Sequence, residues 1–152
     1  MNRIGRWTGY IALVAVVFGA LMTTANAQGD GWTQNYKAAL NLARQQNKMV
    51  LMDFTGSDWC PWCMRLDREI LSTSEFKQYA AKHLILLKID FPRNIPQSQA
   101  LKDQNQRLQS QYGIQGYPTC IILNSQGQKV GQLGYQEGGP GPFIEALNKM
   151  RH

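Results

Sequence analysis

The sequence has little of what marks several protein classes. It contains only 3 Cys and 2 His among 152 residues, too few for a disulfide-dense secreted scaffold and a thin ligand supply for a structural zinc site. Charged residues make up only 17% of the chain and aromatic residues 10%, a balance that argues against a disordered protein. Residues 28–152 contain no internal repeat and no long polar linker. The length therefore suits one folded domain with its own core.

The first 27 residues have the pattern of a secretory signal peptide. Two arginines among the first six residues precede an almost wholly apolar stretch at residues 10–22, and Ala25 and Ala27 provide the small residues of a signal-peptidase site. We therefore expect cleavage after Ala27, export, and one mature domain of residues 28–152. An uncleaved membrane anchor is the alternative, although the apolar stretch is shorter than the ~20 residues that span a bilayer.

The charge of the chain does not indicate a nucleic-acid partner. The whole sequence has a formal charge of +6, and loss of Arg3 and Arg6 with the signal peptide lowers it to +4. The remaining basic side chains are scattered among acidic ones, without a basic run or an aromatic–basic motif. We therefore expect no nucleic-acid binding.

Hydrophobic periodicity predicts an α/β fold with a mixed central sheet. The predicted strands cover about residues 49–54, 83–90, 119–123 and 128–135. The predicted helices cover about residues 32–46, 60–71, 72–82, 99–112 and 143–150, with a break near Ser72. Strands separated by helices imply parallel pairs, and the tight turn before the last strand implies an antiparallel hairpin. We expect a single domain in which helices flank a sheet of about four strands.

Two cysteines stand where a predicted strand runs through a loop into a helix, in the segment Trp59-Cys60-Pro61-Trp62-Cys63. The positive end of a helix dipole favours a thiolate, so Cys60 should ionise more readily than a free thiol of pKa about 8.5. A second thiol one helical turn away can release a mixed disulfide. We therefore predict that Cys60 attacks and that Cys63 is the resolving thiol. A permanent disulfide staple and a zinc site are the alternatives.

Two motifs together resemble the signatures of the thioredoxin superfamily. Trp59-Cys60-Pro61-Trp62-Cys63 follows one predicted strand, and Gly116-Tyr117-Pro118-Thr119 precedes another. More narrowly, residues 54–60, 90–92 and 134–140 resemble exported bacterial thioredoxin-like proteins of the DsbH type and, less closely, the C-terminal domain of DsbD-type electron conduits. The resemblance covers essentially all of the mature chain. It implies a thioredoxin-like fold and a reductant that works in an otherwise oxidising compartment.

The resemblance also implies a substrate site beside the dithiol. The Tyr117–Pro118 bond is expected to be cis, so that the backbone of Tyr117 can pair with an extended substrate segment. A trans proline at the start of a strand is the alternative. Trp59 and Trp62 are expected to flank the dithiol, with Trp62 as an exposed apolar lip for unfolded polypeptide. Ordinary packing is the alternative for both tryptophans.

Asp53 interrupts an apolar strand seven residues before Cys60. A buried carboxylate has a raised pKa and can relay a proton to or from Cys63. Asp53 matches the buried acid of thioredoxins if the loop before Trp59 has one extra residue, and an aspartate that reaches solvent at a strand end is the alternative. We expect the third cysteine, Cys120, to be a buried free thiol, with a regulatory or intermolecular thiol as the alternative.

These observations predict a periplasmic thiol-disulfide oxidoreductase that reduces or isomerises protein disulfides. The sequence has no nucleotide, haem or flavin motif, so we expect the dithiol to be the redox group, with no cofactor and no metal. A DsbD-like membrane partner is the expected electron donor, and the protein is expected to be a monomer. A dithiol oxidase and a redox-inert or metal-carrying binding module of the same fold are the alternatives.

Overall fold

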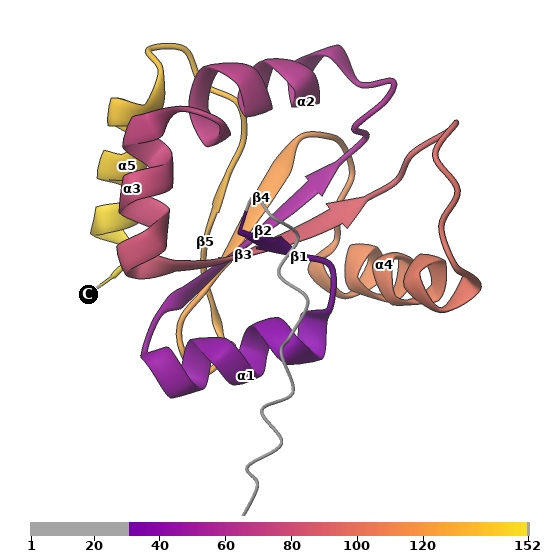
Figure 1. Cartoon of the computed structure of the whole chain (residues 1–152), viewed down its shortest axis with the longest axis horizontal. Helices are drawn as coiled ribbons and strands as arrows, with labels where there is room; N and C mark the ends of the chain where they lie inside the picture. The colour runs from indigo at the N-terminus through magenta and orange to yellow at the C-terminus, as the bar shows by residue number, and fades with distance from the viewer. Residues whose placement is uncertain (1–30, 152) are drawn as a thin grey trace, which may run out of the picture.

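The computed structural model describes residues 31–151, in which two layers of helices enclose a five-stranded sheet (Figure 1). The strands are β1 (Trp32–Thr33), β2 (Met49–Thr55), β3 (Leu84–Asp90), β4 (Thr119–Leu123) and β5 (Lys129–Leu133). They lie in the order β1-β3-β2-β4-β5. β3 is parallel to both β1 and β2, whereas β4 is antiparallel to β2 and β5. The predicted α/β fold, mixed sheet and C-terminal hairpin are confirmed.

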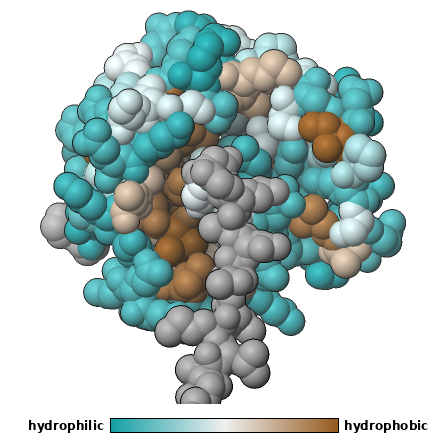
Figure 2. Space-filling model, viewed as in Figure 1, coloured by the Kyte–Doolittle hydropathy of each residue, from teal (hydrophilic) through white to brown (hydrophobic). Residues whose placement is uncertain are grey.

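The helices divide between the two faces of the sheet. They are α1 (Tyr36–Gln46), α2 (Pro61–Leu66), the π-helical η1 (Asp67–Leu71), α3 (Ser74–His83), α4 (Gln99–Tyr112) and α5 (Pro140–Lys149). Side chains of α2, η1, α3 and α5 pack in one buried cluster, and those of α1 and α4 pack in the other. Figure 1 shows α3 beside α5 on one side of the sheet and α1 on the other. The face seen in Figure 2 is mostly hydrophilic, consistent with apolar burial in the two clusters.

The alternation of side chains along β2 decides what faces the redox helix. Val50, Met52 and Phe54 belong to the cluster under α1 and α4. Leu51 belongs to the opposite cluster, together with side chains of α2 and η1. Because successive strand residues point to opposite faces, Asp53 shares the face of Leu51. The central strand therefore directs one carboxylate toward α2.

The predicted helix over residues 32–46 is wrong at its start, because Trp32–Thr33 form strand β1 and the helix begins at Tyr36. Asn35 caps the helix, with its Oδ1 accepting from the N–H of Ala38 at 3.0 Å. Trp32 is in phase with the apolar residues of α1, which made it look helical. Its side chain is instead 5% exposed and packs in the sheet core. The sheet consequently gains a short edge strand beside β3.

The predicted break near Ser72 is confirmed, and the next helix, α3, begins two residues later than predicted, at Ser74. Ser72 ends η1, its N–H donating to the carbonyl of Asp67 at 2.8 Å. Thr73 caps α3, with its Oγ1 accepting from the N–H of Phe76 at 3.3 Å. Thr73 has the extended backbone of a cap residue, whereas Ser72 is still helical. The fourth predicted strand is shorter than expected, since β5 covers only Lys129–Leu133.

No helix among residues 31–151 is long and apolar enough to cross a membrane. The predicted signal peptide, residues 1–27, lies outside the described residues.

Candidate active site

Cys60 and Cys63 form a disulfide at the start of α2. Their Cα atoms lie 5.3 Å apart. Cys60 is the N-cap residue, and its Sγ accepts from the N–H of Cys63 at 3.2 Å. Pro61 occupies the first helical position, where a missing N–H breaks no intrahelical bond. The local sequence thus holds the first sulfur just before the helix and the second within its first turn.

The disulfide is nearly buried, and the loop that precedes it contacts the inner sulfur. Cys60 is 5% exposed and Cys63 is 3% exposed. The N–H of Gly56 donates to the Sγ of Cys63 at 3.5 Å. A Cβ at Gly56 would meet the indole of Trp59 at 2.5 Å, closer than real Cβ atoms come. A side chain at position 56 would therefore force Trp59 away from the loop that seats Cys63.

Asp53 lies beside Cys63 in a small cavity of about 140 Å³, which is also lined by Asp67 and Lys88. Asp53 is 4% exposed, so the prediction of a buried carboxyl is confirmed and the solvent-reaching alternative is wrong. Burial raises its pKa to about 7, while the Lys88 ammonium opposes that rise and Asp67 adds to it. The cavity therefore holds a carboxyl group that changes protonation near neutral pH next to the inner cysteine.

Cys120 is a buried free thiol, as predicted, with no measurable exposure. It sits directly across from Asp53 in the antiparallel pairing of β2 and β4. Its Sγ donates to Oδ1 of Asp53 at 3.8 Å. Burial, followed by the nearby Asp53 charge, raises the pKa of the Cys120 thiol well above its usual range. Within residues 31–151, no three His, Cys, Asp or Glu side chains form a group that could hold a metal ion.

Trp59 anchors the redox loop to the segment that follows β3. Its Nε1–H donates to the carbonyl of Phe91 at 2.8 Å, and its ring packs edge-on against Tyr117 with centroids 5.9 Å apart. The guanidinium of Arg93 lies 4.2 Å from the Trp59 ring centroid. Asp58 accepts from the backbone N–H of Arg93 at 2.9 Å, which contributes most to lowering its pKa. Asp58 and Trp59 therefore tie the loop before α2 to the segment after β3.

A groove of about 430 Å³ runs beside the disulfide helix and contains three of the four residues predicted to contact substrate. Trp62 from α2, Tyr117, Pro118 and Tyr135 form most of its lining. Trp62 is 53% exposed. The Tyr117–Pro118 bond is cis, as expected. Trp59 does not line the groove, but its ring contacts that of Tyr117, which does.

The structure adds a cluster that sequence reasoning missed, here called the Glu69 cluster and made of Trp62, Arg65, Glu69 and Tyr135. Glu69 accepts from Arg65 Nε at 2.9 Å and from the Tyr135 hydroxyl at 2.6 Å. The Arg65 guanidinium lies 5.5 Å from the Trp62 ring centroid and 5.0 Å from that of Tyr135. Arg65 and Glu69 are four residues apart, a spacing that indicates a helical ion pair. Nothing local indicates that Tyr135 joins them.

A family model described as Thioredoxin-like matches residues 31–125. The chain is 34% identical over 114 residues to the disulfide bond reductase DsbH of Chlamydia pneumoniae, an alignment that covers 75% of this chain and 69% of DsbH. It is 32% identical over 88 residues to the thiol:disulfide interchange protein DsbD of Klebsiella pneumoniae, covering 58% of this chain but only 13% of DsbD.

Solved structures give the same picture. A structure titled DsbH Oxidoreductase superposes with a TM-score of 0.75 at 32% identity, covering 79% of this chain and 83% of that one. A thioredoxin from Thermus thermophilus superposes with a TM-score of 0.58 at 22% identity, covering 78% and 84%, which speaks for the fold alone. The chain therefore belongs to the thioredoxin-like family of disulfide oxidoreductases.

Proposed function

We propose that this protein is a periplasmic thiol-disulfide oxidoreductase that reduces or isomerises disulfides of other proteins through Cys60 and Cys63. One observation carries the proposal. The two cysteines form a disulfide at a helix start, with the Cys63 N–H directed at the Sγ of Cys60 at 3.2 Å. In the reduced protein, the same N–H and the helix dipole favour a thiolate on Cys60.

The proposed reaction starts from the reduced dithiol. The Cys60 thiolate attacks one sulfur of a client disulfide, and the other client sulfur leaves as a thiolate. Cys63 then loses its proton and attacks the Sγ of Cys60. This step breaks the mixed disulfide, releases the second client thiolate and forms the Cys60–Cys63 disulfide. Two electrons pass from the protein to the client, and the client thiolates take up protons from water.

We assign the removal of the Cys63 proton to Asp53. The two side chains line the same cavity, and burial raises the pKa of Asp53 to about 7. When the pKa of a base lies near the working pH, a large share of the group is ionised and is still basic enough to accept a proton. The proton can pass to it directly or through one water molecule. Replacement of Asp53 by Asn should therefore slow the resolving step near neutral pH.

The groove beside α2 is the proposed binding site for the client segment around its disulfide. Trp62, Tyr117 and Pro118 line it, and the exposed indole of Trp62 suits apolar residues of an unfolded or flexible polypeptide. The backbone of Tyr117 is the proposed partner for an extended client strand. Trp59 contributes by supporting Tyr117.

The names of the relatives support the direction of the reaction. One relative is named a disulfide bond reductase and another a thiol:disulfide interchange protein, so we propose that this chain works as a reductant with a DsbD-like membrane protein as electron donor. The chain matches only 13% of the length of DsbD, so the proposed partnership is based on the similarity of one domain of DsbD. The signal-peptide pattern of residues 1–27 supports export, and we propose that the mature protein acts as a monomer.

Insulin reduction in dithiothreitol and trapping of intermediates test the proposal. Cys60→Ser should abolish the activity, whereas Cys63→Ser should accumulate a covalent client complex through Cys60. Cys120→Ala, which removes the third thiol but leaves the dithiol in place, is the control: it should still reduce insulin, with an altered pH profile because Cys120 donates to Asp53. Loss of activity only in Cys120→Ala, or client complexes that persist without Cys60, would contradict the assignment.

The potential of the dithiol in a glutathione buffer decides between reductant and oxidase. We expect a value nearer the about −270 mV of thioredoxin than the about −120 mV of DsbA. A value near that of DsbA would favour the dithiol oxidase. No activity in any redox buffer, together with stoichiometric metal, would favour the binding module.

A further inference from the structure

The sulfur of Cys63 receives a backbone hydrogen bond from the loop that follows β2. The N–H of Gly56 donates to it at 3.5 Å, and the carbonyl of Gly56 accepts from the N–H of Cys60 at 2.9 Å. The backbone of this one glycine therefore contacts both cysteines of the dithiol. A small displacement of Gly56 would change the distance from its N–H to the inner sulfur, on which the strength of the bond depends.

The end of β3 holds the residues on both sides of Gly56. Before it, the carbonyl of Thr55 accepts from the N–H of Phe91 at 2.9 Å. After it, Ser57 donates twice to the carboxyl group of Asp90, from its N–H to Oδ1 at 3.0 Å and from its hydroxyl to Oδ2 at 2.6 Å. Both chain neighbours of Gly56 are therefore fixed to the end of β3.

Asp90 is itself held from the direction of α4. Its carbonyl accepts from Nδ2 of Asn105 in α4 at 2.9 Å and from Nε2 of Gln97 at 3.1 Å. Asp90 is 7% exposed and Asn105 is 1% exposed. A carboxyl group at this depth costs stability unless its oxygens are hydrogen-bonded, and in the described part of the chain Asp90 forms no salt bridge. The hydrogen bonds that compensate its burial come from Ser57 in the redox loop.

Cys63 has to ionise in surroundings that oppose a negative charge. It is 3% exposed, and the charged residues that line its cavity are Asp53, Asp67 and Lys88. Burial and the two carboxyl groups disfavour a thiolate, whereas the Lys88 ammonium favours it. In the reduced protein, the thiol of Cys60 at the start of α2 is the other titratable group beside it. A backbone N–H that donates to the sulfur favours the thiolate without adding a charge.

We propose that Ser57 and Asp90 are positioning residues for the resolving step, because their hydrogen bonds hold the N–H of Gly56 on the Sγ of Cys63. The inference rests on the proposed function. In that step Cys63 loses its proton, its sulfur bonds to the Sγ of Cys60, and the client sulfur leaves with the electron pair of the broken mixed disulfide. The N–H of Gly56 stabilises the thiolate that exists before this attack, and Ser57 and Asp90 act through Gly56.

The pKa of the Cys63 thiol tests the proposal without a client protein. It is measured in the full chain with Cys60→Ser by NMR of labelled cysteine, and the other cysteine signal is identified by its loss in Cys120→Ala. Ser57→Ala removes the hydroxyl bond without removing a charge. We expect it to raise the pKa of Cys63 by about 0.5–1 unit, the effect of one weakened hydrogen bond. Ser57→Thr keeps a hydroxyl group and should restore the original value.

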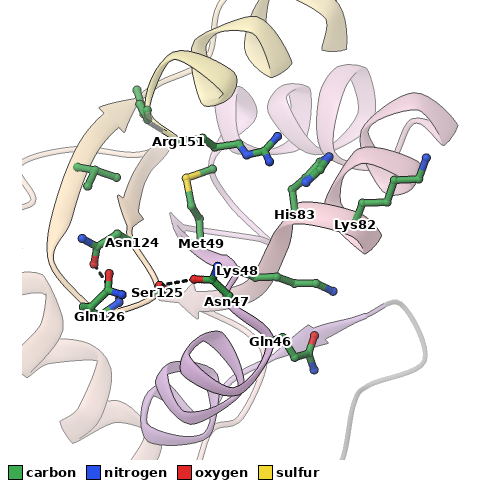
Figure 3. Close-up of a pocket in the computed structure, with 12 residues that line it drawn as sticks. Gln46, Asn47, Lys48, Met49, Lys82, His83, Asn124, Ser125, Gln126 and Arg151 are labelled. Carbon is green, nitrogen blue, oxygen red and sulfur yellow. Dashed lines mark hydrogen bonds between the residues drawn. The ribbon is translucent and has the colours of Figure 1, made fainter.

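Ser125→Ala is the matched control. The Ser125 hydroxyl also donates to a side-chain oxygen, Oδ1 of Asn47 at 3.0 Å, but this bond lies beside a pocket at the other end of the sheet (Figure 3). Met49 lines that pocket and begins β2, whereas Thr55 ends β2 on the side of the redox loop. Six residue steps along a strand span about 20 Å. Ser125→Ala should therefore leave the pKa of Cys63 unchanged.

The rate at which a client is released from its mixed disulfide measures the consequence for the reaction. At neutral pH, Ser57→Ala should slow this release by roughly two- to threefold, less than the loss of thiolate, because a more basic thiolate is a stronger nucleophile. The pKa of Cys60, measured in the chain with Cys63→Ser, should stay unchanged. Asp90→Asn would also remove a charge that acts on Asp53, so Ser57 is the more selective position to change.

An unchanged pKa of Cys63 in Ser57→Ala, or a rise that Ser57→Thr does not reverse, would overturn the proposal. An equal rise in the pKa of Cys60 would also overturn it, because the whole loop would then have loosened. Failure of the proposed function gives a different result. A wild-type protein that does not reduce insulin would contradict that function, whereas the pKa of Cys63 reports on the contact with Gly56 whether or not a client is reduced.

Discussion

At the scale of single residues, Asp53 connects burial with chemistry. The same burial that raises its pKa from 3.8 to about 7 makes its ionised form costly in the folded protein. Because the pKa in the folded state is higher than in the unfolded state, the stability associated with this group is present below pH 4 and is lost as the pH rises through 7. A group kept for catalysis should therefore reduce the stability of the protein at neutral and alkaline pH.

Replacement of Asp53 by Asn should remove that pH dependence. The pKa of Asp53 rises by about 3 units from 3.8, and at about 1.4 kcal/mol per unit the wild type should lose up to about 4 kcal/mol relative to Asp53→Asn between pH 4 and pH 8. Urea unfolding of the disulfide form at several pH values measures the difference. Parallel stability curves for the two proteins would mean that Asp53 ionises normally.

Cys120 should tune Asp53, because its thiol is a hydrogen-bond donor to that carboxyl group in the buried space between β2 and β4. Cys120→Val removes the donor and should raise the pKa of Asp53 further, shifting the pH dependence of stability upward. In an Asp53→Asn background the same change should cause no shift. A shift that persists in the Asp53→Asn background would assign the effect to repacking of the core.

Iodoacetamide should leave Cys120 unmodified until the protein unfolds, since its side chain has no exposure.

At the scale of elements, the Glu69 cluster joins the disulfide helix to the segment between β5 and α5. Glu69 lies in η1 and Tyr135 lies 66 residues later, yet their side chains form a 2.6 Å hydrogen bond. That bond is the largest cause of the lowered pKa of Glu69, ahead of the bond from Arg65. The Trp62 and Tyr135 rings lie 5.4 Å apart. Glu69 thus helps to hold Trp62 and Tyr135, which line the groove, in place relative to each other.

Tyr135→Phe keeps the ring but removes its bond to Glu69, and it should raise the KM for a protein client by roughly two- to fivefold through a looser groove. Glu69→Gln should act in the same direction. Reduction of a small disulfide, which needs no groove, should stay unchanged in both variants. Glu145→Gln is the control because it breaks an exposed ion pair to Lys149 in α5. Equal losses for protein and small disulfides would assign Glu69 to the chemistry of the dithiol instead.

Elements with strong local signals could be predicted from sequence, and those without them could not. α4 was predicted at both ends because Ser98 caps it, accepting from the N–H of Leu101 at 3.3 Å, and Gly113 ends it with a φ of 63°. β1 has only two residues, too few to show a period of two. Its existence depends on pairing with β3, more than 50 residues away in the sequence (Trp32↔Leu86).

The residues of the site also differ in whether a local sequence signal predicts them. Cys60 and Cys63 were found from their spacing, and Asp53 from a charge within an apolar strand, because these signals are contained in one segment. The contact of Tyr135 with Glu69 joins distant segments and leaves no local pattern. The contact of Cys120 with Asp53 likewise depends on the register of β2 with β4, which no single segment of the sequence shows.

At the scale of the whole molecule, β2 ties the redox loop to the centre of the sheet. One end of this strand leads into the loop that carries the disulfide, and the other end begins at Met49, just after α1. The strand lies between β3 and β4 and is buried at every residue. It therefore gives the redox loop a rigid base.

The proposed boundary of the mature domain can be tested against the position of β1. Cleavage after Ala27 would leave four residues before Trp32, so it would cut no described element. An exported sample should therefore have the intact mass of a chain that begins at Gln28. A protein produced from Gln28 should unfold at the same urea concentration as this exported sample.

A protein produced from Gln34 lacks β1 and the buried Trp32 side chain. Its free energy of unfolding should be lower by about 3–5 kcal/mol, the usual cost of removing a buried tryptophan. Retention of residues 1–27 in the exported sample would support the uncleaved anchor, and equal stability of the two shorter proteins would mean that β1 adds nothing to the sheet.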